Sequence, residues 1–552
     1  MSSVRDWAAP NPVTENRGGL IGKGVDRYEG PLKVTGTAPY AYDTPAPSPP
    51  AIGVMATATI PRGRIVSADV SAAEAAPGVM LVWTHRNVPP QAPRGTRANP
   101  RSQRASNPAL ASDRVEYYGQ PVGFVVADTF ENARAAAELI VFDYAPEPAV
   151  VDFKASFGLA EQPPNEEDVR VGDFEAAFAG APVTLDETYF SPLQNHVQME
   201  PCATVAWWEG DKVTVHTSIQ MVKGGQHALA ETLAIPSEQV QLSTRYIGGG
   251  FGGKGQPYED LVLAALAARA LSRPVKGTYT RQQMFHGPIH RPAVEMRGRL
   301  GALALEATTH CARQAIFTEH AANFARSLYA APNRLTGHRL VKMDLPHAGP
   351  MRAPGEASGM LSLECAMDEL AETLGIDPVE LRIRNEPEKD PETGKPFSTR
   401  QLVRCMTEGA QRFGWARRNP VPGQVREGRW LVGMGMAAAI RGNFLLPAKA
   451  GIRIDAGGVV TVRQGMTDIG TGSYTILAQI AAETMGTQLE DVRVEIGDSD
   501  MPPAPGSGGQ FGAATAGSAA FQAAMNLRAA LTELAVGDPR SPLYGGPAEF
   551  VT

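Results

Sequence analysis

Residues 246–260, YIGGGFGGKGQPYED, gather glycine around one aromatic side chain. Glycines at positions 248, 249, 250, 252 and 253 flank Phe251. Glycine weakens helices and strands, so this stretch is expected to be a loop whose backbone takes positive φ or lies against something large. The glycines would let a ligand contact the main chain, and the ring would cover one face of that ligand.

Two further glycine turns each lead into a helical pattern. TDIGTG (467–472) precedes a run that bears Ile476, Leu477 and Ile480, and PGSGGQFG (505–512) precedes a long run of small residues. Free N–H groups and the positive dipole end of a helix start favour anions. An ordinary helix start explains either turn, taken alone, about as well as a ligand cradle does. Three such loops in one chain favour a large cofactor with phosphate-like groups.

Other common chemistries lack their motifs. The sequence has no GxxxxGK[ST] loop and does not open with a strand–GxGxxG–helix unit. Its four cysteines stand in no ligand spacing, so each is expected to be an isolated buried thiol, with no iron–sulfur or zinc site: Cys202, Cys311, Cys365 and Cys405. The net charge of −7, without long runs of one sign, argues against nucleic-acid binding.

The pattern of elements divides the chain into a loose N-terminal arm and three further units. The arm covers residues 1–25, and the units cover 26–150, 171–420 and 425–552, with a polar loop at about 90–113 and a linker at 150–170. The first unit should contain a strand at 122–127, a helix at about 130–140 and a strand at 140–144. Helices are also expected at about 258–271, with an apolar face that includes Ala270, at about 358–374, and after the N-cap Asp377.

The first residues, MSSVRDWAAP, contain no apolar signal core and no twin arginine, and no later run resembles a membrane span. The chain is therefore expected to carry no export signal of its own. Its default location would be the cytoplasm, and the periplasm would require co-export with a signal-bearing partner.

Long motifs resemble the molybdenum-binding (molybdopterin) subunit of the xanthine dehydrogenase and aldehyde oxidase family, and most closely its bacterial periplasmic aldehyde oxidoreductases. They are YIGGGFGGK, HRP (290–292), YAAPN (329–333), MRAPGEASG (351–359), DELAETLGIDPVELRIRN (368–385), TDIGTGSYTILAQIAAE (467–483) and APGSGG (504–509). The resemblance implies an α+β fold. A small hammerhead α/β domain at 26–150 would precede a first molybdopterin-binding domain at 171–420 and a second, incomplete one at 425–552.

The resemblance also implies roles for residues near the cofactor. Gln220 would hydrogen-bond an oxygen ligand of molybdenum, although the position also suits a satisfied glutamine at a strand end. Arg352 would contact the cofactor, whereas without the resemblance it suggests a turn or ion-pair residue. The remaining cofactor contacts would be the loop Gly249, Gly250, Phe251 and Gly252, the pterin turn Ile469, Gly470, Thr471 and Gly472, and the distal turn Gly512 and Ala513.

Within this family, three positions favour an aldehyde over a purine. Purine-oxidising members carry a glutamate directly after the lysine of GGGFGGK, where this chain has Gly255. They carry a ring-clamping phenylalanine where this chain has Pro354. Arg441 stands where aldehyde oxidoreductases have a pocket arginine, which would polarise a carbonyl or hold a carboxylated substrate. The alternative for Arg441 is a surface arginine.

The cofactor of bacterial members is usually molybdenum–molybdopterin cytosine dinucleotide, and the reaction is hydroxylation of a small aldehyde. This chain lacks ligands for onward electron transfer, so a 2Fe-2S subunit and an FAD subunit are expected partners. The family's general-base glutamate lies in a Gly-rich motif beyond GGPAEFVT; neither Glu356 nor Glu549 occupies that motif. The chain therefore resembles a C-terminally truncated member. The alternatives are a non-catalytic fragment or half of a split subunit, inactive alone, and a pure scaffold.

Overall fold

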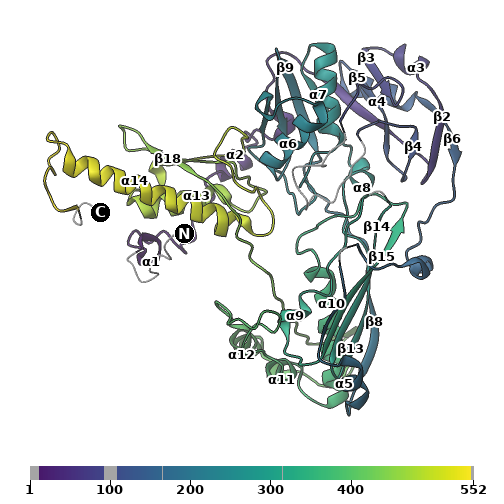
Figure 1. Ribbon diagram of the computed structural model, residues 1–552, viewed down its shortest axis with the longest axis vertical. Coiled ribbons are helices and arrows are strands. Elements are labelled where there is room, and N and C mark those ends of the chain that lie inside the picture. Colours follow the sequence, from purple (N-terminus) through teal and green to yellow (C-terminus); the bar gives the residue numbers. More distant parts are fainter. Residues whose placement is uncertain (1–10, 93–107, 165, 314, 549–552) are drawn as a thin grey trace. The chain divides into compact units, whose positions relative to one another are not determined.

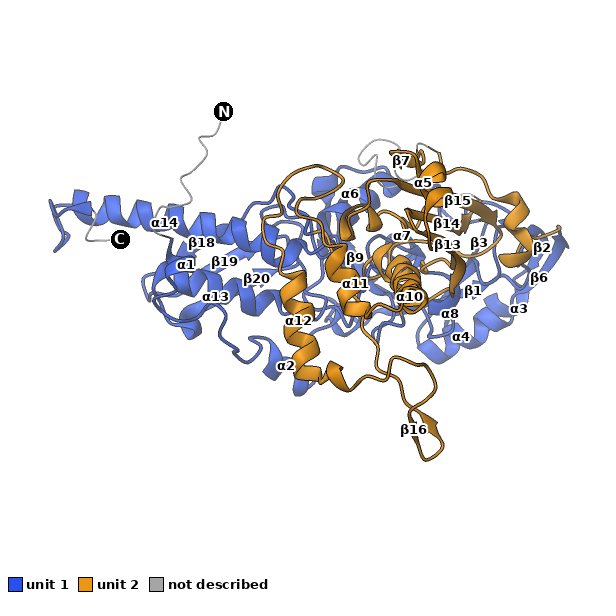
Figure 2. Ribbon diagram, turned by 90° about the horizontal axis from the view of Figure 1, so that it is seen from below, with its two compact units in different colours: residues 1–147, 197–288, 443–552 blue, residues 148–196, 289–442 orange. Residues whose placement is uncertain are grey.

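The computed structural model describes residues 11–92, 108–164, 166–313 and 315–548 (Figure 1). Most of the predicted loop at 90–113, and Glu549, lie outside these residues. The chain divides into two compact units, coloured separately in Figure 2, and each is described by itself. Unit 1 comprises Met1–Glu147, Val197–Pro288 and Asn443–Thr552, and unit 2 comprises Pro148–His196 and Ile289–Gly442.

A seven-stranded sheet organises the first part of unit 1, in the order β11-β10-β9-β12-β1-β5-β3. Its strands are β1 Ala51–Thr57, β3 Val79–Thr84, β5 Pro121–Ala127, β9 Ala203–Glu209, β10 Lys212–Thr217, β11 Val240–Ser243 and β12 Val275–Thr278. Strand β5 is buried at every residue, which explains its continuous apolar sequence. It confirms the strand predicted at 122–127.

Helices α4 (Phe130–Glu138), α6 (Val222–Leu233) and α7 (Glu259–Leu271) pack against this sheet. Helix α7 was predicted with one apolar face, but all residues from Asp260 to Ala268 are buried and Ala270 is exposed. The prediction of its buried face is wrong because the sheet and neighbouring segments cover the helix on nearly every side. A small sheet, β4-β2-β6, contains Arg114–Val115, Gly63–Asp69 and Val141–Pro146, and its last strand confirms the strand predicted after α4.

The C-terminal part of unit 1 is a three-stranded sheet covered by helices. Strands β18 (Gly451–Ile454), β19 (Val460–Gln464) and β20 (Val492–Ile496) pack with α13 (Ser473–Met485) and α14 (Ser518–Gly537). The N-terminal arm is not loose in its described part. Gly18 and Leu20 donate backbone hydrogen bonds of 2.8 and 3.0 Å to the Glu483 carboxylate on α13.

Unit 2 is built on a five-stranded sheet, β7-β15-β14-β13-β8, which α10 covers on one face. The strands are β7 Val169–Val171, β8 Leu185–Ser191, β13 Val294–Leu300, β14 Leu303–Ala312 and β15 Arg334–Met343. Helix α10, Glu356–Leu374, confirms the helix predicted at 358–374 and ends at Gly375 with φ of 66°. Helix α11, Pro378–Arg384, begins as predicted: Asp377 accepts from the amides of Val379 and Glu380.

The other elements are short or peripheral. They are α1 Pro12–Glu15, α2 Gly30–Val34, α3 Ser71–Glu74, α5 Phe174–Gly180, α8 Gln283–His286, α9 Ala325–Leu328, α12 Leu402–Phe413, β16 Arg426–Glu427, β17 Trp430–Leu431 and a π-helical turn at Gly512–Gly517.

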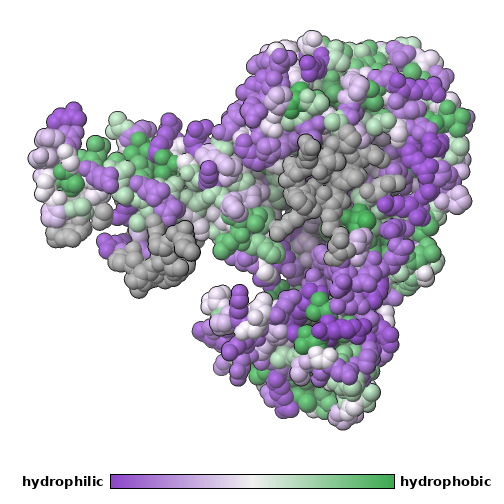
Figure 3. All heavy atoms as spheres, in the orientation of Figure 1, coloured by the Kyte–Doolittle hydropathy of each residue, from purple (hydrophilic) through white to green (hydrophobic). Residues whose placement is uncertain are grey.

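Two of the four cysteines differ from expectation. Cys202 and Cys311 are buried, but Cys365 and Cys405 are exposed, so the prediction of buried thiols is wrong for these two. Cys365 lies on the side of α10 that faces away from the core residues Leu363 and Met367. On the face drawn in Figure 3, hydrophilic and hydrophobic side chains are interspersed. Within the described ranges, no helix has both the length and the apolar composition that a bilayer span requires.

Candidate functional site

Gln220 joins the three glycine segments of unit 1. It follows strand β10, and only 1% of it is exposed. Its side-chain Nε2 donates to the carbonyl of Ser507 at 2.7 Å, and its Oε1 accepts from the amides of Gly252 and Lys254, each at 3.1 Å. Since Ser507 is 287 positions away in sequence, this one amide holds distant loops together. The oxygen and nitrogen positions of the amide follow from these partners.

The main chain of Gln220 makes further bonds to the same segments. Its N–H donates to the carbonyl of Lys254 at 2.7 Å, and its carbonyl accepts from the amide of Ser507 at 3.0 Å and from Thr467 Oγ1 at 2.8 Å. Ser507 Oγ in turn donates to the Thr467 carbonyl at 2.6 Å. The loops 248–254, 467–472 and 506–513 therefore meet around one buried residue, which we call the Gln220 hub.

Glycine is required in the GGGFGG loop for two physical reasons. A Cβ at Gly248 would overlap Glu200, and a Cβ at Gly250 would lie 2.6 Å from Gln220 Oε1. At these two positions glycine makes room for the protein's own side chains, whereas the sequence suggested room for a ligand. Gly249 and Gly252 have φ of 92° and 97°, which glycine adopts readily.

Phe251 is unusual in both conformation and exposure. Its φ of 54° places a bulky residue in the left-handed region, which costs free energy. The ring lies next to Gly249 and is 38% exposed, so it does not pack into the core. A strained, exposed ring at the tip of a braced loop is suited to contact a ligand.

A buried ion pair that the sequence did not indicate braces this loop. Lys254 is completely buried, and its Nζ lies 2.7 Å from Glu200 Oε2. The same oxygen accepts the Gly248 amide at 2.8 Å, so Glu200 ties together the two ends of the loop. The only signal in the sequence is a single lysine within a glycine run. Its carboxylate partner is 54 positions away and could not be assigned.

The two remaining glycine turns differ in how their amides are used. At TDIGTG, the Asp468 carboxylate accepts from the amides of Gly470, Gly472 and Tyr474 at 2.6, 3.4 and 3.5 Å. The expectation of free N–H groups is wrong for these residues, because a protein carboxylate already occupies the helix start. Ile469 is half-buried, and Thr471 is exposed.

The turn before α14 is arranged differently. It begins a π-helical turn at Gly512 with no side-chain cap, and Ala513 is exposed. Amides in the first turn of a helix have no partner within the helix, and no described side chain caps those of Gly512 and Ala513. Gly512 also lies against Met466 and Ser473, which brings this turn close to the TDIGTG turn.

In unit 2, the MRAPGE turn is held by a buried charged pair. Arg291 donates through Nη2 to the carbonyls of Met351, at 3.0 Å, and Arg352. Glu319 Oε1 accepts from the Gly355 amide at 2.8 Å and lies 3.8 Å from Arg291 Nε. We call this set the Glu319 hub. Burial raises the pKa of Glu319, although hydrogen bonds and Arg291 oppose that shift.

Arg352 and Arg441 are both in unit 2. The Arg352 side chain is exposed at the turn. Arg441 Nη1 lies 2.5 Å from Glu356 Oε1, so a carboxylate on α10 compensates the charge expected to act on substrate. The structure brings Gln220 and the three glycine loops together in unit 1, and it places both arginines near α10 in unit 2.

Glu166, His320 and His338, also in unit 2, have ligand atoms within 4.8 Å of one another. His338 Nε2 accepts from the Ala322 amide at 3.2 Å, so the proton of a neutral His338 ring is on Nδ1. That Nδ1 lies 3.0 Å from Glu166 Oε1. A metal bound to His338 Nδ1 would leave the ring proton on Nε2, where it would face the Ala322 N–H. The geometry therefore fits a cluster that shares protons better than it fits a metal site.

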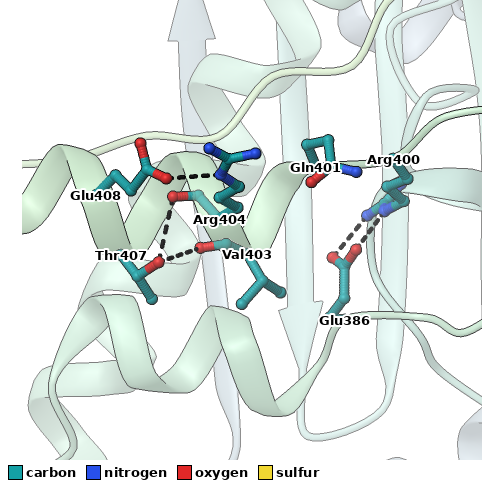
Figure 4. A pocket seen from close by; sticks show the side chains of 7 residues that line it. All are labelled: Glu386, Arg400, Gln401, Val403, Arg404, Thr407 and Glu408. Atoms are coloured by element: carbon teal, nitrogen blue, oxygen red, sulfur yellow. Dashed lines mark hydrogen bonds and ion pairs between the residues drawn. The ribbon is translucent and has the colours of Figure 1, made fainter.

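A shallow pocket, shown in Figure 4, lies on α12 and the segment before it. Its lining residues are Glu386, Arg400, Gln401, Val403, Arg404, Thr407 and Glu408. Arg400 pairs with Glu386 and Arg404 pairs with Glu408, at 2.5 and 2.6 Å. Its charged groups already satisfy one another, and none of the residues expected to contact cofactor lines it.

Comparisons with known protein families match almost the whole chain. Models described as "Molybdopterin cofactor-binding domain" match residues 159–386 and 408–541. A model described as "Aldehyde oxidase and xanthine dehydrogenase, a/b hammerhead domain" matches residues 35–148.

Curated relatives and solved structures agree with these matches. The aldehyde oxidoreductase molybdenum-binding subunit PaoC of Escherichia coli K12 is 44% identical over 547 residues, which cover 97% of this chain and 73% of the relative. The xanthine dehydrogenase molybdenum-binding subunit of E. coli O157:H7 is 27% identical and covers 86% and 68%.

Among solved structures, aldehyde oxidoreductase from Desulfovibrio gigas has a TM-score of 0.78 at 26% identity, covering 94% of this chain and 60% of that one. Quinoline 2-oxidoreductase from Pseudomonas putida 86 has a TM-score of 0.80 at 24% identity, covering 96% and 72%. The second likeness shows the fold alone.

Proposed function

Because the chain belongs to the aldehyde oxidase and xanthine dehydrogenase family of molybdenum-binding subunits, we propose that it serves an aldehyde oxidoreductase that converts aldehydes to carboxylic acids. The observation that carries the proposal is the meeting of three glycine loops at the Gln220 hub. The hub brings the Phe251 ring and the uncapped amides of Gly512 and Ala513 onto braced loops, as an extended anionic cofactor requires.

The residues present fit a molybdopterin cofactor in three respects. Among the described residues Gln220 Nε2 donates only to Ser507, so its second N–H would serve a ligand oxygen. Phe251 presents a partly exposed ring from a braced loop. The uncapped amides of Gly512 and Ala513 suit the diphosphate of a cytosine dinucleotide form.

At the TDIGTG turn, Asp468 makes the helix start unsuitable for phosphate. Ile469, Gly470, Thr471 and Gly472 would therefore contact the neutral pterin rather than an anionic group. Asp468 would hold their backbone in shape for that contact. Arg352 would supply the positive charge from the MRAPGE turn.

When bound, the molybdenum centre would supply oxygen transfer and accept two electrons. The protein would orient the substrate and exclude water. With Gly255 and Pro354, the chain lacks at these two positions the glutamate and the phenylalanine that a purine site of the family carries. Since Glu356 compensates Arg441, we propose that the preferred substrate is an uncharged aldehyde rather than a carboxylated one.

Electrons would leave through a 2Fe-2S subunit and an FAD subunit, which would bind the chain as partners. Its parts would act as a hammerhead domain at 26–150, a first molybdopterin-binding domain at 171–420 and a second at 425–552.

The test is oxidation of benzaldehyde and of hypoxanthine by the chain co-purified with its partner subunits from a cofactor-producing host. We expect carboxylic acid from benzaldehyde and no oxidation of the purine. Gln220→Ala should lower aldehyde turnover, whereas Gln241→Ala on β11 of the same sheet should not. Purine oxidation without aldehyde oxidation would overturn the proposal. A chain that holds molybdenum but oxidises neither substrate would be a binding subunit only.

A further inference from the structure

The Glu166 cluster connects three segments of unit 2. Glu166 precedes β7, His320 precedes α9, and His338 lies in β15. Glu166 Oε1 lies 3.0 Å from His320 Nδ1 and 3.0 Å from His338 Nδ1. The His338 side chain is 1% exposed, the Glu166 side chain 18% and the His320 side chain 52%. One carboxylate thus bridges a buried ring and a half-exposed ring.

The cluster holds residues 319–322 from both sides. Glu166 contacts His320, and His338 Nε2 accepts the Ala322 amide at 3.2 Å. Residue Glu319 of the same segment then accepts from Gly355 N at 2.8 Å and from Ser358 Oγ at 3.3 Å. A fixed position for 319–322 therefore fixes the start of α10 and the turn before it.

Close packing strengthens this connection. A Cβ at Gly359 would overlap the Ala321 carbonyl, and a Cβ at Gly355 would lie 2.5 Å from the His320 carbonyl. The two segments meet backbone to backbone, with no flexible side chain between them to absorb a shift. Movement of residues 319–322 would be transmitted to the MRAPGE turn that carries Arg352.

The charges around His320 make the contact dependent on protonation. The hydrogen bond that His320 donates to the Glu166 carboxylate raises the pKa of His320, and burial opposes that shift. Burial would raise the pKa of Glu166, but the hydrogen bond from His320 and the His338 ring 3.0 Å away outweigh it and hold that pKa well below its usual range. The other charged groups that face His320 are Glu319 of its own segment and Arg326 of α9.

The contact between Glu166 and His320 should weaken as pH rises. Because the folded pKa of His320 is raised, its stabilising contribution is complete below its unfolded value and is lost as pH rises through the folded value. Because the folded pKa of Glu166 is lowered, its contribution is present at neutral pH and is lost only in strong acid. The contact should be tightest in mildly acidic solution and loosen under alkaline conditions.

We infer that Glu166, His320 and His338 are positioning residues that hold the MRAPGE turn through residues 319–322, in a proton-dependent manner. The inference rests on the proposed function only for what Arg352 contacts. The positioning itself is a property of unit 2 and can be measured without cofactor or substrate.

The test is hydrogen–deuterium exchange of the full chain, read by mass spectrometry at pH 6.5 and pH 9 and corrected for the intrinsic rate at each pH. In the wild-type protein, the corrected exchange rate in peptides covering 319–322 and 353–359 should rise about tenfold from pH 6.5 to pH 9. This is the change expected when one hydrogen bond to a charged group is lost. Glu166→Gln should exchange quickly at both values, which removes the pH dependence.

The matched control is Glu161→Gln. It removes a charge from the same connecting segment, where Glu161 pairs with Lys342 on β15 at 2.8 Å and, among the described residues, forms no ion pair with 319–322. This variant should keep the wild-type pH response. Equal responses of wild type and Glu166→Gln would overturn the inference. Protection by added Zn²⁺ that requires Glu166 would also overturn it, since the cluster would then be a metal site. If the wild-type complex did not oxidise aldehydes but its exchange changed with pH as expected, only the proposed function would be contradicted.

Discussion

The Gln220 hub of unit 1 and the Glu319 hub of unit 2 solve the same problem with different chemistry. Each ties a glycine-containing turn to a distant segment. Gln220 does so with a neutral amide whose donor and acceptor both bind peptide groups at 2.7–3.1 Å. Glu319 does so with a fully buried charge, and the nearby Arg291 completes the arrangement at 3.8 Å.

The two hubs differ in how well their polar atoms are satisfied. Within the described part of the chain, Glu319 Oε2 and Arg291 Nε are buried without a hydrogen-bond partner. The bonds of the uncharged Gln220 amide should not depend on pH, although the buried Lys254–Glu200 ion pair braces the same loop. A charged hub with unpaired atoms depends on its counter-charge and on protonation. The comparison predicts that the Gln220 side-chain bonds hold at every pH and that the Glu319 hub responds to protonation.

The largest expected effect is at the charged hub. Arg291→Met should lower the free energy of unfolding by about 3 kcal/mol, because it leaves Glu319 buried without its cation. Glu319→Gln in the same chain should restore part of the loss. Denaturant titration would measure both. The exposed pair Arg297–Asp186 gives the control Arg297→Met, which should cost no more than about 1 kcal/mol. Equal losses in the two single variants would contradict the buried-charge account.

The neutral hub should respond nearly as strongly. Gln220→Ala removes three side-chain hydrogen bonds and leaves a void, which should cost roughly 2–3 kcal/mol. The loss should be the same at pH 6 and pH 8.5, since no ionisable group is involved. Thermal unfolding at the two pH values would check this. A pH-dependent loss would show that Gln220 is coupled to a charge and would weaken the contrast between the hubs.

One buried carboxyl group of unit 1, that of Asp260, should make the stability of this unit depend on pH as well. Asp260 at the start of α7 is 2% exposed, and burial raises its pKa to about 7, although Thr204 donates to it. Because the folded pKa exceeds the unfolded one, its stabilising contribution is lost as pH rises from about 4 to about 7.

The variant Asp260→Asn should remove this decrease of stability with rising pH. The wild-type protein should lose on the order of 1–3 kcal/mol more than the variant between pH 5 and pH 7.5. Urea midpoints at both values would measure the difference. Parallel pH profiles for the two proteins would show that Asp260 titrates normally.

The smallest effect is expected at the TDIGTG turn. Asp468→Ala should cost about 1 kcal/mol, the usual value for loss of a capping side chain. Asp377→Ala at the start of α11 is the matched change in unit 2 and should cost a similar amount. Differential scanning calorimetry can compare them. No loss at Asp468 would indicate that its amides are free, and the TDIGTG turn would then be a second candidate for phosphate.

The sequence predicts structure best where the signal is local. Asp377 followed by proline predicts the start of α11, and the apolar run at 122–127 predicts a strand, because the residues that decide each element are neighbours in sequence. The family resemblance and the α+β fold class are confirmed, since long motifs are specific.

The sequence predicts contacts poorly where partners are distant. Glycine runs indicated the loops, but not the residues that hold them. Folding alone brings together three pairs: Glu200 with Lys254, Gln220 with Ser507, and Glu319 with Gly355. The same limit explains two errors. Cys365 lies on the outer side of its helix, and the amides at TDIGTG are taken by Asp468, which sequence spacing alone does not show. The roles of individual residues toward cofactor stay predictions.

Molybdenum and cytosine nucleotide content tests the central claim most directly. Gly506→Ala would place a Cβ against the Gln220 carbonyl and strain a φ of 80°, whereas Gly486→Ala strains a φ of 70° in open space. In chain purified from a cofactor-producing host, wild type and Gly486→Ala should hold about one molybdenum per chain, with cytidine monophosphate released on hydrolysis. Gly506→Ala should hold almost none. A folded wild-type chain without molybdenum, or full loading of Gly506→Ala, would contradict the account.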